Sequence, residues 1–392
     1  MTTAAPHNEI QTSFRPRRAY ITRLSKFLPN EPVPNDEMEL TLGMVNGKPS
    51  RARSIVLRNN RIKTRYYALK DGKSTHGNAE MAALAVKGLF DDEAPLSDLQ
   101  ILAAGTTTPE QLLPSHAAMI HGLLGSHELE IVSTTGACLC SFQGLKYAYM
   151  AIVSGLADSA ACVGSEKLST WMHASRFQPE GDVLKEMEAN PILAFDKDFL
   201  RWMLSDGAAA ALVQSQPASH GVSLRIEWME ITSYAHQLES CMYAGSVKQE
   251  DGSLKGWNDM DTGEWLPQSV FSLKQDTRLL GDNIVPRSMD FLQTLMQKHG
   301  LTADDVDHYL PHMSSEYFKN QIVEELKRIG MDIPLEKWFY NLTRVGNVGS
   351  ASAFLMLEEL FHSGRLKKGE RILVMVPESA RFSYANLYLT VV

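Results

Sequence analysis

Cys138 lies where a β-prone run meets a helix-prone run. Residues 128–133 carry the strand pattern, and residues 138–153 carry the helix pattern. The first turn of a helix has unpaired N–H groups at the positive end of the helix dipole, which stabilise a thiolate. A lone cysteine is more often a small buried core residue. The position makes Cys138 a candidate nucleophile. Other parts of the sequence are needed to choose between this role and that of a buried core residue.

The second half of the chain repeats the pattern of the first. Asn347 also opens a helix-prone run after a glycine-containing turn. Three pairs of landmarks share an offset of 209 residues: Cys138 and Asn347, Gly155 and Gly364, and Asp98 and Asp307. A constant offset indicates a duplicated α/β unit. Two copies related by a pseudo-twofold axis would bring a thiol and an amide to one central site.

His312 is the third candidate. It follows the apolar run 309–311 at the expected end of a strand, where catalytic groups gather in layered sheets. Alone, it is more simply interpreted as a structural histidine. Together with Cys138 and Asn347, it forms a candidate site that is more specific than any of the three residues alone.

These residues need a scaffold, and alternating strands and helices predict a mostly parallel, layered sheet. We expect an N-terminal half, residues 1–220, with the nucleophile, and a C-terminal half, residues 221–392, with the histidine and asparagine. Residues 234–286 have weak periodicity and are expected to form a capping insertion that shapes a substrate channel. Residues 1–17 are expected to form an arm.

The expected strands are 19–28, 99–104, 128–133, 159–164, 208–213, 223–231, 371–376 and 385–392. The expected helices are 75–90, 114–124, 138–153, 289–299, 316–329 and the run opened by Asn347.

Composition narrows the class of protein. The chain has 392 residues, 44% hydrophobic and 21% charged, which is ordinary for a globular protein. A net charge of −8 argues against general nucleic-acid binding, although an acidic carrier protein could still meet a local basic patch. No apolar run reaches the ~18 residues of a membrane span, and no signal peptide is evident.

The four cysteines have no framework spacing, and Cys138 and Cys140 are too close for a zinc knuckle. We therefore expect a reduced, cytoplasmic protein with no metal. No glycine-rich phosphate loop or dinucleotide fingerprint is supported by its context, so no cofactor is expected.

The chain resembles the β-ketoacyl-acyl-carrier-protein synthase III branch of the thiolase superfamily, nearly from end to end. Residues 60–68 are similar to the family's GI–x–x–R segment, 104–109 to its threonine-rich turn, and 204–209 to its DGA turn. Cys138 matches the nucleophile, His312 the catalytic histidine and Asn347 the catalytic asparagine. The resemblance implies an α/β fold with a duplicated, five-layer α-β-α-β-α architecture.

It also implies roles. Cys138 would carry the acyl group; Cys140 would need a two-residue deletion to keep the family spacing. His312 and Asn347 would stabilise an enolate, and backbone N–H groups of Cys138 and near Ser379 would form an oxyanion hole. The enzyme would be an acyltransferase and a homodimer that uses thioesters of acyl carrier protein or coenzyme A.

This sequence departs from the family's pattern at two places that bear on the choice of substrate. Where the family has His-x-x-Asn, this chain has Ser315, and residues 377–384 replace the family's glycine-rich loop. With the long middle segment, these features resemble the branch that makes 2,5-dialkylcyclohexane-1,3-diones, precursors of dialkylresorcinols. Glu166 and Arg381 are candidates for a ring-closing acid/base step, and both have an equally good structural interpretation.

Three alternatives stay open. The chain could be an initiating synthase that uses malonyl-acyl carrier protein. It could be an acyltransferase to oxygen or nitrogen, or an inactive partner subunit of another ketosynthase. Asn347 argues against acyl transfer, and the retained Cys/His/Asn set argues against an inactive subunit.

Overall fold

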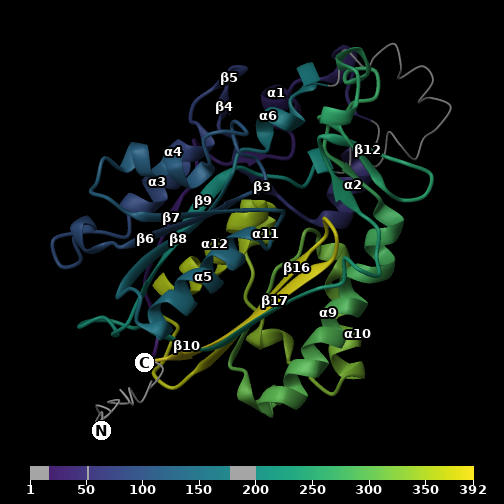
Figure 1. Cartoon of the computed structure of the whole chain (residues 1–392). Coiled ribbons are helices and arrows are strands. Elements are labelled where there is room, and N and C mark those ends of the chain that lie inside the picture. The colour runs from purple at the N-terminus through teal and green to yellow at the C-terminus, as the bar shows by residue number, and fades with distance from the viewer. Residues whose placement is uncertain (1–16, 51–52, 177–199) are drawn as a thin grey trace, which may run out of the picture.

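The computed structural model describes residues 17–50, 53–176 and 200–392, so nearly all of the expected arm lies outside the described residues (Figure 1). The described part is built on one nine-stranded sheet of order β15-β16-β17-β10-β1-β9-β8-β6-β7. Its strands are β1 (Tyr20–Phe27), β6 (Ile101–Thr106), β7 (Glu130–Thr135), β8 (Ser159–Glu166), β9 (Gly207–Gln214), β10 (Leu224–Ser233), β15 (His308–Pro311), β16 (Arg371–Glu378) and β17 (Ser383–Val391).

The prediction of a mostly parallel sheet was wrong. In the described residues, three neighbouring pairs are parallel, β15·β16, β6·β7 and β6·β8, and the other five are antiparallel. Parallel neighbours need a crossover connection, which helices provide between β6, β7 and β8. β16 and β17 are instead joined by a short hairpin turn, which forces the opposite direction.

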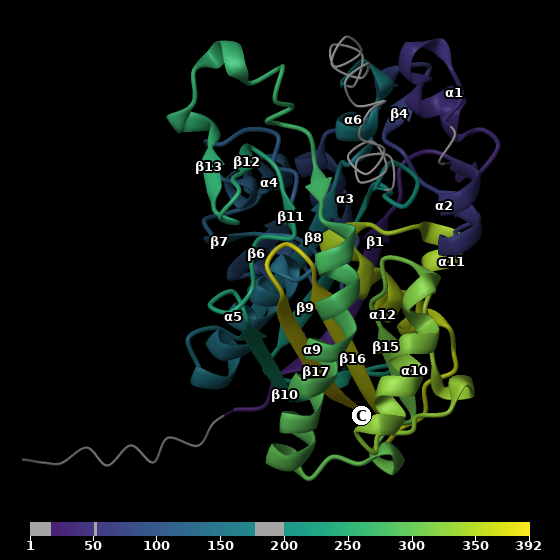
Figure 2. The same ribbon diagram turned by 90° about the vertical axis from the view of Figure 1, so that its right-hand side faces the viewer.

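Helices cover this sheet in layers (Figures 1 and 2). The α-helices are α1 (Met38–Leu42), α2 (Arg53–Asn60), α3 (Asn78–Lys87), α4 (His116–Leu124), α5 (Cys140–Ser154), α6 (Ser169–Met172), α9 (Thr277–His299), α10 (Lys319–Arg328), α11 (Leu342–Val345) and α12 (Ser352–His362). One core cluster joins α5 and α12 to both ends of the sheet. A second joins α9 and α10 to the outer face of β16 and β17, and a third joins α3 and α4 to the outer face of β6, β8 and β9. The order of layers is therefore helices, one half of the sheet, helices, the other half of the sheet, helices, as expected for the thiolase-like fold.

The two ends of the sheet repeat one scheme. β6·β8, β8·β9 and β9·β1 are parallel, antiparallel and antiparallel, and so are β15·β16, β16·β17 and β17·β10. Trp338 forms an isolated parallel bridge with Tyr309 of β15, and so takes the place beside β15 that β7 takes beside β6 in the first half. β1 pairs with β10 at the junction and makes the sheet continuous.

Most expected elements occur within a few residues of their predicted bounds, but α9 is an exception. The sequence predicts a helix over 289–299, whereas α9 begins at Thr277, where the Asp276 side chain accepts a hydrogen bond from the N–H of Leu279. Pro286 lies inside this helix. Packing of Leu280, Ile284 and Val285 against the core compensates for the backbone hydrogen bond that proline removes.

The middle segment forms two small local strand pairs, β11·β14 and β12·β13. Two further short pairs, β2·β3 and β4·β5, lie in the N-terminal half. Their bounds are β2 (Val33–Pro34), β3 (Thr64–Arg65), β4 (Leu69–Lys70), β5 (Lys73–Ser74), β11 (Met242–Tyr243), β12 (Ser246–Lys248), β13 (Leu254–Gly256) and β14 (Lys274–Gln275). Within the described residues, no helix has the length and apolar character to cross a membrane.

Candidate active site

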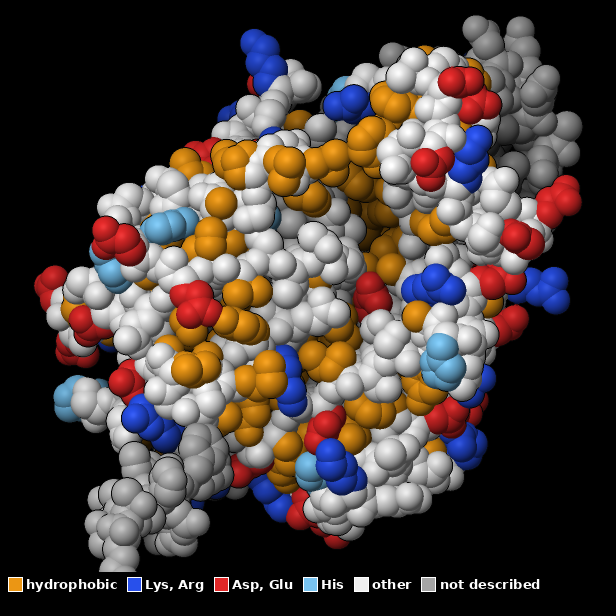
Figure 3. Space-filling view, in the orientation of Figure 1, with side chains coloured by type: hydrophobic (Ala, Val, Ile, Leu, Met, Phe, Trp, Pro, Cys, Tyr) orange, Lys and Arg blue, Asp and Glu red, His pale blue; other side chains and the backbone are white. Residues whose placement is uncertain are grey.

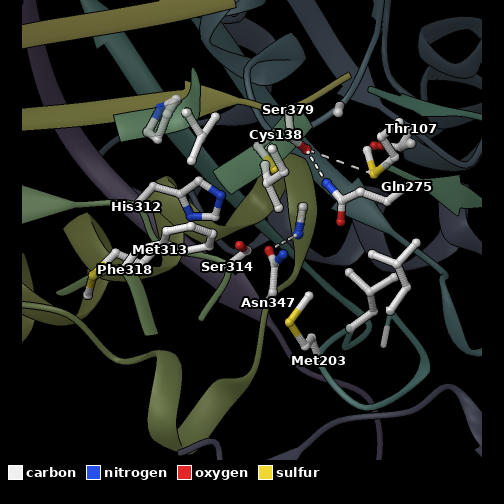
Figure 4. A pocket seen from close by; sticks show the side chains of 18 of the residues that line it. Thr107, Cys138, Met203, Gln275, His312, Met313, Ser314, Phe318, Asn347 and Ser379 are labelled. Carbon is white, nitrogen blue, oxygen red and sulfur yellow. Dashed lines mark hydrogen bonds between the residues drawn. The ribbon is translucent and has the colours of Figure 1, made fainter. Parts of the chain in front are cut away.

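Cys138, His312 and Asn347 line one cavity (Figure 4). They come from three separate turns: the turn before α5, the end of β15, and the turn before the 3-10 helix Gly349–Ala351. All three residues are buried, at 9%, 3% and 4% exposed. The convergence that the repeated pattern predicts is present in the structure.

Cys138 is in the turn between β7 and α5, two residues before the helix begins. Burial raises the pKa of its thiol well above the usual range, and the charges of Glu378 and Glu166 raise it further. This direction is opposite to the one expected from the helix start, and the protonation state of Cys138 stays a prediction. Desolvation and the two nearby carboxylates favour the neutral thiol.

His312 follows β15, and its backbone N–H donates to the carbonyl of Met375 at 2.8 Å. That bond fixes the residue against β16. Burial lowers the pKa of its imidazole to about 4. The ring is therefore neutral at physiological pH and carries one N–H donor.

Asn347 has a fixed amide. Its Oδ1 accepts from the N–H of Gly349 at 3.0 Å and from the Ser352 hydroxyl at 3.3 Å. With the oxygen engaged in this way, the Nδ2 group is the end that the amide can offer to a ligand. Asn347 and His312 thus contribute two N–H donors to the same cavity.

The remaining wall is mostly apolar, and none of the described lining residues is Asp, Glu, Lys or Arg. The nonpolar side chains come from α9, from the residue before α6, from residues 200–204, from β11 and the residue before β14, and from residues 313–322. They are Leu168, Leu200, Met203, Leu204, Met242, Leu273, Leu280, Ile284, Val285, Met313, Phe318 and Ile322. Figure 3 shows a hollow walled by hydrophobic side chains, which lies between α6 and β12 in the view of Figure 1. A cavity of this composition suits an alkyl chain.

Ser379 lines the cavity opposite Asn347, in the turn after β16. Its hydroxyl accepts from the Gln275 amide at 3.1 Å, which ties this turn to the middle segment. Met242, Leu273 and Gln275 of that segment also line the cavity. The predicted roles of Ser379 in an oxyanion hole and of 234–286 as a cap stay predictions.

Glu166 lies one layer behind the cavity. Its carboxylate accepts from the backbone N–H of Thr107 at 3.0 Å, the Thr108 hydroxyl at 2.8 Å and the N–H of Ser350 at 3.1 Å. Gly349, with φ of +50°, packs so closely that a Cβ there would approach Glu166 Oε1 to 3.0 Å. Glu166 therefore holds together turns from both halves, and burial raises its pKa.

Arg381 is exposed and donates from Nε to the carbonyl of Leu238 at 3.1 Å. Neither Arg381 nor Glu166 is among the lining residues. The hypothesis that these two side chains act in ring closure stays a prediction.

Ser315, at the family's asparagine position, accepts from the N–H of Tyr317 at 3.2 Å and caps the 3-10 helix Glu316–Phe318. Arg65 and Asp206, from the matched GI–x–x–R and DGA segments, are fully buried. Arg65 donates to the carbonyl of Trp202, and Asp206 accepts from the N–H of Ala68 at 2.7 Å. These three residues organise the scaffold around the cavity.

Sequence reasoning missed Glu378. This last residue of β16 is 7% exposed and accepts the N–H of Ala137, the residue before Cys138, at 3.0 Å. The signal that could have identified it is an acidic residue inside the loop 377–384, which replaces the family's glycines.

Two family models match separate parts of the chain. Residues 87–218 match the family model of the β-ketoacyl synthase N-terminal domain, and residues 296–379 match that of the 3-oxoacyl-[acyl-carrier-protein] synthase III C terminal. The chain is 22% identical over 378 residues to β-ketoacyl-[acyl-carrier-protein] synthase III of Chlorobium luteolum, covering 95% of this chain and 98% of the relative.

Solved structures show the same fold. AbyA1, a tetronic acid condensing enzyme, superposes with a TM-score of 0.74 at 18% identity, over 95% of this chain and 99% of that one. OleA of Xanthomonas campestris, determined with lauric acid and lauroyl-CoA, gives 0.72 at 19% identity, over 96% and 99%. The chain is thus similar to the β-ketoacyl synthase III enzymes of the thiolase superfamily over nearly its whole length. It is accordingly an enzyme of the acyltransferase class, a condensing enzyme.

Proposed function

We propose that this protein forms a carbon–carbon bond by Claisen condensation between an acyl group on Cys138 and a second acyl thioester. The observation that carries the proposal is the meeting of Cys138, His312 and Asn347 in one buried cavity with an otherwise largely apolar wall. A nucleophile and two fixed N–H donors are the parts that this reaction needs.

In the first step, the Cys138 sulfur attacks the carbonyl carbon of an acyl thioester. The new S–C bond replaces the bond to the carrier thiol, and the Cys138 proton leaves with that thiol. Backbone N–H groups of Cys138 and of the turn at Ser379 stabilise the oxyanion that forms in between.

In the second step, His312 and Asn347 donate hydrogen bonds to the thioester carbonyl of the second substrate. They stabilise the enolate that remains when the second substrate loses CO₂ or transfers its α-proton to water. The enolate carbon attacks the acyl carbon on Cys138; the new carbon–carbon bond replaces the S–C bond, and the cysteine leaves as a thiolate that takes up a proton from water. A neutral His312 suits this role because it needs only to donate.

For the substrates, we propose acyl thioesters of acyl carrier protein or coenzyme A, with a β-ketoacyl thioester as the second partner. The apolar wall supports an alkyl chain, and the bound lauroyl-CoA of OleA supports a thioester of that kind. The condensed product would then close by an aldol-type step to a 2,5-dialkylcyclohexane-1,3-dione. The loop 377–384, with its charged residues, is the feature that supports this finer proposal.

We also propose a homodimer. β7 is the edge strand of the sheet, and its residues are only partly covered in the single chain. An exposed edge offers unpaired backbone groups to a second copy. Light scattering on the purified protein would test this, and a monomer would count against it.

The main experiment supplies the protein with two substrates at once. The purified protein is incubated with acyl and β-ketoacyl thioesters of both carriers, and adducts and products are identified by mass. An acyl adduct on Cys138 followed by a condensed product supports the proposal, and a cyclic rather than linear product supports ring closure. No adduct with any acyl thioester would instead favour the inactive-partner alternative.

A further inference from the structure

The nucleophile turn rests on a buried carboxylate. Glu378 Oε1 accepts the backbone N–H of Ala137 at 3.0 Å. A Cβ placed on Gly136 would lie 3.5 Å from the same oxygen. The carboxylate of the last residue in β16 therefore packs directly against the two residues that precede Cys138.

The side chain points away from the cavity. Pro377 and Ser379 line the cavity, whereas Glu378 between them does not. Alternation along the strand thus turns Glu378 to the back of the nucleophile turn. It approaches the nucleophile turn from the side that faces away from the cavity.

No cation in the described residues pairs with this carboxylate. The described ion pairs do not include Glu378, and its other polar contacts are to Ser383 across the β16–β17 hairpin. Burial raises its pKa. In its ionised form, the Glu378 carboxylate interacts strongly with its neighbours because little solvent screens it.

The titratable groups around Cys138 in the described residues include no Lys or Arg. They are Glu378 from β16, Glu166 from β8, Cys140 from α5, and His312 after β15. His312 is neutral, since its pKa is about 4. Tyr384 of β17, next to Glu378, is also buried. The nucleophile is thus surrounded by acidic and neutral groups.

We propose that Glu378 is a positioning residue for the nucleophile. It holds the turn through the Ala137 N–H, and its negative charge keeps Cys138 a thiol until an acyl thioester arrives. The inference rests on the proposed function in that Cys138 is the reacting group. A thiol is protected from oxidation and alkylation when no substrate is bound, because the thiolate is the reactive form.

The test separates the effect of the Glu378 charge from the effect of its hydrogen bond to the Ala137 N–H. Glu378→Gln keeps a carbonyl oxygen for the Ala137 N–H but removes the charge, and Glu378→Ala removes both. Glu370→Gln is the matched control, because Glu370 precedes the other end of β16 and pairs with His308. All variants are made in a Cys140→Ala background, so that the Cys138 peptide reports one thiol.

Alkylation of Cys138 by iodoacetamide is followed by mass over about pH 6 to 10. For Glu378→Gln, we expect the profile to move to lower pH and the rate below the midpoint to rise about tenfold, as for a thiol pKa lowered by about one. Glu370→Gln should match the parent. Where the reagent does not reach Cys138, the ultraviolet absorbance difference from a Cys138→Ser protein reports the thiolate directly.

A Glu378→Gln profile that coincides with the parent, or moves to higher pH, would overturn the inference. Acyl capture is measured in parallel and should persist in Glu378→Gln but slow in Glu378→Ala. If the parent captures no acyl group, the proposed function fails while the alkylation profile still tests Glu378. If the parent captures acyl groups and the profile does not move, only the role of Glu378 fails.

Discussion

The hydroxyl of Ser141 donates a hydrogen bond to the backbone carbonyl of Ser350 at 2.5 Å. These two residues are 209 apart in sequence, the same offset that relates Cys138 to Asn347, and each lies three residues after one of them. Equivalent positions of the two halves therefore touch, as they must near a pseudo-twofold axis. This contact holds the start of α5, which follows Cys138, against the 3-10 helix Gly349–Ala351, which follows Asn347.

Cys138→Ala should abolish acyl capture and every downstream product, because no other described cysteine lines the cavity. Intact-protein mass after incubation with an acyl thioester measures capture. Cys140→Ala is the control and should still load, since Cys140 begins α5 and does not line the cavity. Loading of Cys138→Ala with a new adduct on Cys140 would contradict the assignment.

His312→Ala and Asn347→Ala should each reduce condensation by roughly 10²–10³-fold while acyl loading persists, because each removes one donor to the developing enolate. Product formation from preloaded enzyme, compared with adduct formation, separates the two steps. His121→Ala is a control on the exposed side of α4. Equal losses in loading and condensation would argue for a structural role instead.

The two donors and the thiol could be predicted from the sequence because each stands at a turn that a local pattern marks. Cys138 and Asn347 open helix-prone runs at a constant offset, and His312 ends an apolar strand. Glu378 could not be predicted in this way. Its contact with Ala137 spans 241 residues and exists only because the hairpin of β16 and β17 brings the carboxylate under the nucleophile turn.

The same distinction explains the errors in the fold. Pro286 is a reliable helix breaker only when the surrounding residues have no packing that compensates, and α9 has such packing. Strand order and direction depend on which strands pair across the molecule. The pairing of β1 with both β9 and β10 leaves no local mark in the sequence.

The condensation rate should be independent of His312 titration across about pH 6 to 8, because burial lowers the pKa of this imidazole to about 4. Charged His312 would appear only as the pH falls toward that value. Single-turnover condensation of preloaded enzyme, measured as a function of pH, checks this. A limb near pH 6.5 that disappears in His312→Gln would show that the imidazole titrates normally.

Asp206→Asn should change the pH dependence of stability. Burial raises the pKa of Asp206 from 3.8 to about 6, so its contribution is fully present below about 3.8 and is lost as the pH rises through 6. The full loss corresponds to roughly 3 kcal/mol. The stability of the variant lacks this dependence on pH. The variant also loses one of the two carboxylate oxygens that accept from the N–H groups of Ala68 and Ser169, which costs about 1–3 kcal/mol of stability.

Urea unfolding at about pH 4.5 and pH 7 measures the two effects separately. The free-energy difference between the parent and Asp206→Asn should be smaller at the higher pH. Asp98→Asn, at an exposed position, should leave the slope unchanged. A difference that grows with pH would mean that Asp206 is stabilised as a carboxylate, contrary to its burial.

If Glu166 and Arg381 act in ring closure, Glu166→Gln and Arg381→Ala should spare the first carbon–carbon bond and change the ratio of cyclic to linear product. The geometry makes the two variants informative in different ways. Glu166 holds Thr107 and Ser350 in place, so its substitution should lower both steps by a common factor if its role is only structural. Arg381 is exposed and bonded to Leu238, so a purely structural Arg381 should leave both products unchanged. Product masses from paired acyl and β-ketoacyl thioesters give the ratio directly, and full ring formation in both variants would remove these residues from the mechanism.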